Sequence, residues 1–228
     1  MKLTYFGHST YQLETADATI LIDPFISGNP MAEGVVTVSD LSPDAILVTH
    51  AHGDHWGDTP EIAQNSGAVV VSNYEITQYL TAHHGYENVQ PLNFGGGWDF
   101  PWGRVTQTKA SHSSSFPDGS YGGNPGGFVI ESAGKCVYAA GDTDPFSEMQ
   151  WIGEDYDLDL AVLPIGDCFT MGPVGSLRAA SMLKAARVMP VHYNTFPLIE
   201  VSTEEWKEMM RESGYETVVL SPGDSFEI

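Results

Sequence analysis

V-T-H-A-H-G-D-H-W-G-D, residues 48–58, is the stretch that decides the fold of this chain. It continues the apolar run Ala45–Val48, which predicts a buried strand. Within six residues it carries three imidazoles and one carboxylate, at His50, His52, Asp54 and His55. Histidine and carboxylate are the usual protein ligands of zinc and similar divalent ions. The stretch therefore predicts a metal site at the end of a strand.

The spacing within the stretch predicts that its side chains divide between two ions. Alternate side chains of an extended segment share a face, so His50 and His52 can reach one ion together. Asp54 and His55 follow the turn that Gly53 permits, and they can face a second ion. Neither ion has enough ligands from this stretch alone, so the rest of the chain must supply the others.

The remaining predicted ligands are His112, Asp142 and His192, each of which follows a different predicted strand. His112 completes the first site, His192 completes the second, and Asp142 bridges the two ions. Two divalent ions held about 3.5–4 Å apart lower the pKa of a shared water toward about 7 and polarise a carbonyl or phosphoryl oxygen. The predicted activity is therefore that of a hydrolase whose bridging hydroxide attacks the substrate.

Strands and helices are expected to alternate along most of the chain, after an opening meander. The strands are expected at Lys2–Phe6, Thr10–Glu14, Thr19–Asp23, Ala45–Val48, Ala68–Ser72, Trp98–Phe100, Arg104–Lys109, Phe128–Glu131, Cys136–Ala140, Leu158–Pro164, Arg187–Val191, Thr217–Leu220 and Ser225–Glu227. The helices are expected at Thr59–Asn65, Asn73–His83, Pro145–Ile152 and Val174–Ala186, with a last one opened by Ser202–Glu205. No linker or repeat divides the chain, which predicts one α/β (α+β) domain spanning residues 1–228. Two packed sheets with helices outside, an αββα sandwich of four layers, fit this order.

A shortage of basic residues explains the net charge of −21, since only 9 residues are Lys or Arg against 30 acidic ones. This argues against binding to nucleic acid or to an anionic membrane, both of which need clustered bases. A high-salt cytoplasm and an ordinary acidic protein both remain compatible with the charge. The N-terminus lacks the apolar core of a signal peptide, so a cytoplasmic protein is expected. Cys136 and Cys168 lie in apolar runs and are expected to be buried free thiols.

A melting series in rising salt separates the two explanations of the charge. A halophilic protein gains stability between low and molar salt, because screening shortens the reach of self-repulsion to about 3 Å at 1 M salt. An unchanged melting temperature across that series contradicts the halophilic explanation.

Several motifs together resemble the metallo-β-lactamase superfamily. They are H-x-H-x-D-H at His50, G-H-S-T-Y at Gly7, D-P-F at Asp23, H-S-S-S-F at His112, A-G-D-T at Ala140, P-I-G-D-x-F-T-M-G-P at Pro164 and H-Y-N-T-F-P at His192. Within that superfamily they are similar to a branch of small metal-dependent hydrolases related to the ascorbate-phosphate lactonases. The resemblance covers nearly the whole chain and implies an αββα sandwich with a dinuclear site at one edge.

The resemblance also implies individual roles. Asp54 orients the attacking hydroxide in addition to binding metal, Asp23 fixes a ligand imidazole from behind, and His8 lies near the metals as a catalytic, supporting or substrate-facing group. The ions are expected to be zinc first, with manganese, nickel or iron as alternatives. The substrate is expected to be a small lactone, cyclic ester or phosphoester. Asp167 and Thr170 are candidate substrate contacts, because loops at strand ends tend to carry function.

Two other activities remain open for this fold. A redox member would need a more carboxylate-rich site and a flavin-binding domain, and a non-catalytic member would usually have lost ligands. The scarcity of Lys and Arg argues against a nuclease. A homo-oligomer is compatible with the sequence. His83 and His84 are expected only to end a helix, where histidine meets the helix dipole favourably.

Overall fold

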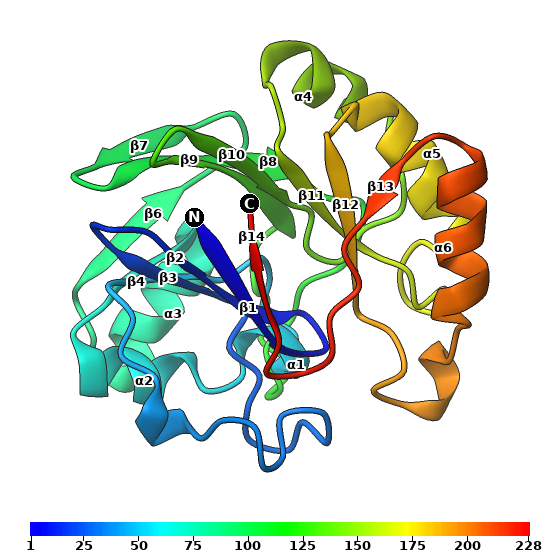
Figure 1. Ribbon diagram of the computed structural model, residues 1–228. Helices are drawn as coiled ribbons and strands as arrows, with labels where there is room; N and C mark the ends of the chain where they lie inside the picture. The colour runs from blue at the N-terminus through cyan, green and yellow to red at the C-terminus, as the bar shows by residue number, and fades with distance from the viewer.

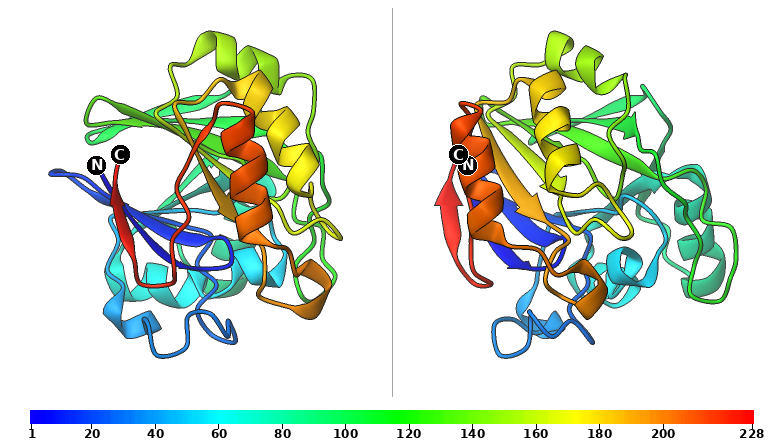
Figure 2. Two further views of the ribbon diagram at one scale, coloured as in Figure 1. Left: turned by 45° about the vertical axis from the view of Figure 1, so that its right-hand side comes forward. Right: turned by 90° about the vertical axis from the view of Figure 1, so that its right-hand side faces the viewer.

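The computed structural model describes the whole chain, residues 1–228. Two seven-stranded sheets pack face to face, and helices cover the outer face of each (Figure 1). The expected four-layer αββα arrangement is confirmed. The two ends of the chain lie side by side (Figure 2), and the amide of Ile228 donates to the carbonyl of Met1 at 2.9 Å.

The first sheet has the strand order β14-β1-β2-β3-β4-β5-β6. Its strands are β1 (Lys2–Gly7), β2 (Thr10–Glu14), β3 (Thr19–Ile22), β4 (Ala45–Leu47), β5 (Val69–Asn73), β6 (Val89–Leu92) and β14 (Ser225–Glu227). The pairs from β14 to β3 are antiparallel, whereas β3, β4, β5 and β6 are parallel. The parallel strands therefore all end at one edge, and the histidine-rich stretch 48–58 leaves β4 at that edge.

The second sheet has the strand order β13-β12-β11-β10-β9-β8-β7. Its strands are β7 (Gly97–Phe100), β8 (Gly103–Lys109), β9 (Gly126–Ser132), β10 (Lys135–Ala139), β11 (Leu160–Pro164), β12 (Arg187–Val191) and β13 (Glu216–Thr217). The strands from β10 to β13 are parallel. The loops that follow β10, β11 and β12 consequently leave the sheet at one edge.

Three apolar cores hold the layers together. The largest lies between the sheets, a second joins the second sheet to its helices, and a third joins the first sheet to its helices. The helices of the first sheet are α2 (Thr59–Ser66) and α3 (Tyr74–His84), and those of the second are α4 (Met149–Asp155), α5 (Pro173–Leu183) and α6 (Thr203–Glu212). One four-residue helix, α1 (Gly53–Trp56), and two short 3-10 turns, Val38–Asp40 and Pro197–Ile199, lie in the loops.

Local signals explain most helix ends. The side chain of Asn73 accepts from the amide of Ile76 and begins α3, and Gly85 ends it with φ 67°. The hydroxyl of Ser202 likewise accepts from the amide of Glu205 at the start of α6. His83 and His84 lie in the last turn of α3, as expected. No helix of the structure is both long and apolar enough to cross a bilayer.

Apart from element ends that differ by up to three residues, as in β13 and α5, the structure differs from the sequence-based expectations at four places. Residues 53–56 form a helical turn rather than an open turn, and α4 begins at Met149 instead of Pro145. Strand β6 was not expected because it contains Pro91, but it is the edge strand of its sheet, where proline is tolerated. The expectation of two buried thiols is wrong: Cys168 is exposed in the loop after β11, and Cys136 is only partly buried.

Candidate metal centre

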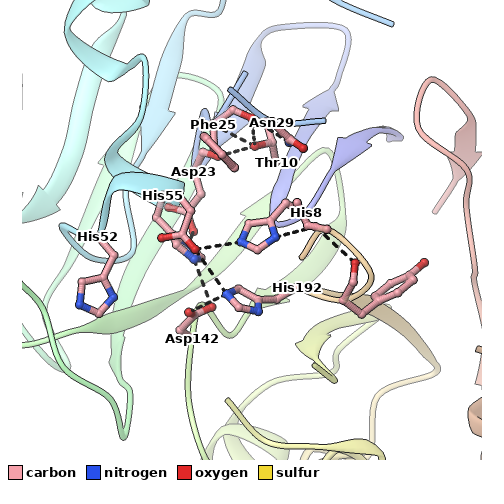
Figure 3. A network of polar contacts seen from close by, with 12 residues as sticks. His8, Thr10, Asp23, Phe25, Asn29, His52, His55, Asp142 and His192 are labelled. Atoms are coloured by element: carbon pink, nitrogen blue, oxygen red, sulfur yellow. Dashed lines mark hydrogen bonds and ion pairs between the residues drawn. The ribbon is translucent and has the colours of Figure 1, made fainter. Parts of the chain in front are cut away.

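Eight polar side chains converge at the edge where the parallel strands end. They are His8, His50, His52, Asp54, His55, His112, Asp142 and His192, and all of them were singled out from the sequence. Figure 3 shows His8, His55, Asp142 and His192 pointing toward one another, with His52 set to one side. Both sheets contribute. Five of the residues follow strands of the first sheet, and the other three, His112, Asp142 and His192, follow strands of the second.

Three imidazole nitrogens form the first donor group. They belong to His50, His52 and His112, and they lie within 4.8 Å of one another. The Nε2 of His50 is 3.0 Å from the Nδ1 of His52. His50 is buried, whereas His52 and His112 are partly exposed, so this group faces solvent on one side.

The second donor group consists of Asp54, His55, His192 and also His8. The Oδ2 of Asp54 lies 3.1 Å from the Nε2 of His8 and 3.7 Å from the Nε2 of His192. His8 was expected near the metals as a supporting or substrate-facing group. Its nitrogen lies among the donors themselves, a position that depends on the contact between the first β-turn and the loop after β12. The amide of His192 donates to the carbonyl of His8 at 2.9 Å across that contact.

Asp142 lies between the two groups and contacts both. Its Oδ2 is 3.8 Å from the Nε2 of His50 and 3.6 Å from that of His112, and 3.0 Å from the Nε2 of His192. Its Oδ1 is 3.2 Å from the Nε2 of His55. The carboxylate is only 3% exposed, so water cannot satisfy it in place of these neighbours.

The donor separations fit divalent cations. Ligand atoms about 2.1 Å from a tetrahedral ion lie about 3.4 Å apart, and the separations described above run from 3.0 to 3.8 Å. In addition, the buried Nε2 of His55 and Oδ1 of Asp142 have no hydrogen-bond partner. Buried polar atoms are rarely left in this state, and a cation between them satisfies both. The residues present therefore fit a metal centre.

The pKa values of the converging side chains also favour a bound cation. Burial would lower the pKa of His55 and of His192, but the Asp142 carboxylate holds the first well above its usual range and raises the second to about 9. Burial would raise the pKa of Asp54, but hydrogen bonds from His192 and His8 hold it well below its usual range. Burial lowers the pKa of His8 to about 4, so that imidazole is neutral. A cation bound here takes the place of the protons on His55 and His192.

Asp23 fixes imidazoles of both groups from behind. It accepts from His55 Nδ1 at 2.7 Å, from the Thr49 amide at 2.8 Å and from the Thr49 hydroxyl at 2.7 Å. Because the Thr49 hydroxyl gives its proton to Asp23, it accepts from His50 Nδ1, 3.0 Å away. When a cation replaces the proton on the Nε2 of His55, both imidazoles keep a proton on Nδ1 and turn an unprotonated Nε2 toward the centre. Asp23 was expected to fix one predicted ligand imidazole. Through Thr49 it also orients a second one, that of His50.

The backbone is strained at three of these residues. His8, Asp23 and His192 have φ of 56°, 45° and 55°, a region that residues other than glycine rarely adopt. Such strain persists only where the surrounding structure enforces it, and it concentrates at functional sites. It is a second indication, independent of residue type, that this edge is the functional one.

Hydrogen bonds from Ser114 and Asn73 hold the loop between β8 and β9 against the centre. The Ser114 hydroxyl accepts from the Ala51 amide and donates to the Gly122 carbonyl, and Asn73 Nδ2 donates to the Gly122 and Asn124 carbonyls. A Cβ at Gly122 would lie 2.3 Å from the Cβ of Ala51, so only glycine allows this approach. Asn73 and Ser114 were not identified from the sequence as anchors of this loop, because their partners are distant along the chain.

The two predicted substrate contacts lie in the loop after β11. The carboxyl of Asp167 packs beside Gly172, and the Thr170 hydroxyl donates to the carbonyl of Met171 at 3.1 Å. Neither side chain bonds to the eight converging residues, so their contact with substrate stays a prediction. A surface hollow of about 640 Å³ lies at the opposite end of the second sheet, around the β9–β10 turn, away from the donor groups.

Comparison with known proteins agrees with this geometry. A family model described as "Beta-lactamase superfamily domain" matches residues 18–193. The chain belongs to this superfamily. A relative from Salinibacter ruber, a "UPF0173 metal-dependent hydrolase", is 48% identical over 99% of this chain and 99% of its own length. A relative of the same description from Thermus thermophilus is 49% identical over 98% and 97%. Within the superfamily, the chain is thus a member of the UPF0173 group of metal-dependent hydrolases.

Solved structures of the superfamily share the fold. A metallo hydrolase from Ignicoccus hospitalis superimposes with a TM-score of 0.90 at 39% identity, covering 100% of this chain and 98% of that one. An isothiocyanate hydrolase from Delia radicum gut bacteria gives a TM-score of 0.79 at 24% identity over 100% and 99%, which shows a common fold alone.

Proposed function

We propose that the protein binds two divalent ions and hydrolyses a small lactone, cyclic ester or phosphoester. His50, His52 and His112 hold the first ion, Asp54, His55 and His192 hold the second, and Asp142 bridges them. The observation that carries the proposal is the position of Asp142, whose two oxygens contact imidazoles of both donor groups within 3.8 Å. His8 is either a further ligand of the second ion or the group that orients Asp54.

Two divalent ions held by these residues would lower the pKa of a shared water and polarise the substrate's carbonyl or phosphoryl oxygen. The residues of the chain supply the remaining functions. Asp54, 29% exposed, is the most accessible of the central carboxylates and orients the attacking water through its free oxygen. Asp23 and Thr49 keep His50 and His55 in the tautomer that leaves Nε2 free. The loop between β8 and β9, which Ser114 and Asn73 hold in place, covers one side of the centre.

The donor set favours zinc over iron. Five imidazoles and two carboxylates form a nitrogen-rich centre, which suits zinc and, less well, manganese or nickel. A redox function for this site would require a more carboxylate-rich donor set. We propose a cytoplasmic protein that acts on small molecules, with no nucleic-acid or membrane partner, because its surface lacks basic clusters.

Metal content and hydrolysis measured together test the proposal. Protein purified without chelator should contain about two ions per chain. After reconstitution with zinc, manganese or nickel it should hydrolyse members of a panel of lactones, esters and phosphodiesters. His52→Ala should lose the ion of the first group and most of the activity. Protein that carries two ions per chain and hydrolyses none of the panel with any metal contradicts the proposed function.

A further inference from the structure

The nine basic residues lie outside the segments that surround the proposed metal centre. None of the segments that leave the strands at this edge contains Lys or Arg; these segments are residues 8–9, 23–44, 48–58, 110–125, 140–148, 165–172 and 192–202. Four of the bases, Lys2, Arg104, Lys135 and Arg187, stand at or beside the first residue of a strand whose other end leads into the centre. These four bases therefore lie at the end of the sheets opposite the centre.

The base closest in sequence to a ligand is Lys109, three residues before His112, and it is neutralised. Its ammonium lies 2.7 Å from the Glu148 carboxylate and over the ring of Phe146, on the side of the second sheet that faces α4. Of the other eight bases, all but Arg178 and Lys184 on or next to α5 also pair with a carboxylate. The segments around the centre therefore contain no cationic side chain to hold an anionic group of a substrate.

The segments around the centre present carboxylates and apolar side chains instead. Asp118, Asp144, Asp167 and Glu200 are exposed in these segments. Phe196, 37% exposed, has its ring 5.6 Å from that of His8, and Phe25 lies 5.7 Å away on another side of His8. Leu198, two residues after Phe196 and within the Pro197–Ile199 turn, is 66% exposed. We call Phe25, Phe196 and Leu198 the apolar wall.

The centre itself offers little net attraction to an anion. Two divalent cations bring four positive charges, against which stand the carboxylates of Asp23, Asp54 and Asp142 and the negative charge that the attacking water acquires. These charges balance. A phosphate or carboxylate elsewhere on the substrate would therefore meet a neutral centre surrounded by carboxylates.

We propose that the substrate of this site is uncharged and apolar: a neutral lactone or cyclic ester whose hydrocarbon part lies against the apolar wall. This inference rests on the proposed function and narrows it by excluding substrates with an anionic handle. Water adds to the carbonyl carbon, the bond from that carbon to the ring oxygen breaks, and the ring oxygen takes a proton from the water. The product is a hydroxy acid. Its new carboxyl group loses the second proton of the water to solvent, and the resulting carboxylate is repelled by the surrounding acids and leaves.

A matched pair of substrates tests the proposal. One is a five-membered lactone with a carboxamide on the ring, and the other is the same lactone with a carboxylate in its place. In about 0.1 M salt, the metal-loaded protein should hydrolyse the carboxamide with a kcat/KM about tenfold higher. The gap should shrink in about 1 M salt, where the screening length falls from about 10 Å to about 3 Å. A carboxylate hydrolysed as fast as the carboxamide at low salt overturns the inference and leaves the hydrolase function intact.

Two variants that each add one positive charge show whether the preference for the uncharged substrate arises beside the centre. Phe196→Lys puts an ammonium beside the centre, and Trp151→Lys puts one on α4, where Trp151 is 63% exposed. Phe196→Lys should shift the ratio of the two kcat/KM values about tenfold toward the carboxylate, and Phe196→Leu should not. Trp151→Lys should leave the ratio unchanged. Equal shifts in both Lys variants contradict a local effect and overturn the proposal.

Binding to the metal-free protein gives a readout that does not need catalysis. Without ions the lactones are not hydrolysed, and calorimetry should find tighter binding of the carboxamide than of the carboxylate. If the protein loaded with two ions hydrolyses neither lactone nor any other member of the panel, the proposed function fails, and this measurement still decides the charge preference. Equal or tighter binding of the carboxylate overturns the inference.

Discussion

Replacing Asp142 by asparagine should release both metal ions and lower hydrolysis by at least about a thousandfold, since the ions supply several kcal/mol of transition-state stabilisation. Asparagine keeps the size of the side chain but removes its charge. The carboxylate is buried and contacts His50, His112, His55 and His192, so its loss affects both donor groups together. Metal content by mass spectrometry and kcat/KM for the best substrate of the panel measure the effect.

Asp144→Asn is the matched control for this variant. Asp144 is exposed and lies two residues further along the same loop, outside the donor groups. The control should keep both ions and most of the activity. An Asp142→Asn protein that retains both ions with normal affinity contradicts the bridging role.

Replacing Asp23 by alanine should produce the largest loss of stability among the residues of the centre. Asp23 is 1% exposed, and without its carboxylate the amide and hydroxyl of Thr49 and the Nδ1 of His55 lose their buried acceptor. Breaking such a buried network costs about 3–5 kcal/mol in the free energy of unfolding. Metal affinity should fall by about 10–100-fold, because the imidazoles of both groups lose their fixed orientation. Urea unfolding and competition with a chelator measure the two effects.

Asp58→Ala separates the two effects of the Asp23 variant. The Asp58 carboxylate also accepts two protein donors, the amides of Ile26 and Ser27, each at 2.8 Å, but it contacts no imidazole. This variant should lose some stability and keep its metal affinity. If Asp23→Ala binds both ions as tightly as Asp58→Ala does, the orienting role of Asp23 is wrong.

The sequence alone predicted the elements that have strong local signals. Most strands were predictable from their short apolar or β-branched runs, and α3 and α6 because Asn73 and Ser202 begin them. The convergence of the ligands followed from their position after strands that prove to be parallel. Strand β6 was missed because its proline is acceptable only at a sheet edge, and the edge is a property of the assembled fold.

The parts of the centre that could not be predicted depend on contacts between distant segments. His8 enters the second donor group because the turn after β1 bonds to the loop after β12, some 180 residues away. The relay from Asp23 through Thr49 to His50 requires the end of β3 to lie beside that of β4. The exposure of Cys168 likewise results from the path of the loop after β11.

The central claim is that two ions share the Asp142 carboxylate. An anomalous difference map from a crystal of the zinc-loaded protein, recorded at the zinc absorption edge, tests it most directly. We expect two peaks about 3.5–4 Å apart, one beside His50, His52 and His112 and one beside Asp54, His55 and His192, with Asp142 between them. A single peak, or two peaks of which one lies away from Asp142, would contradict it.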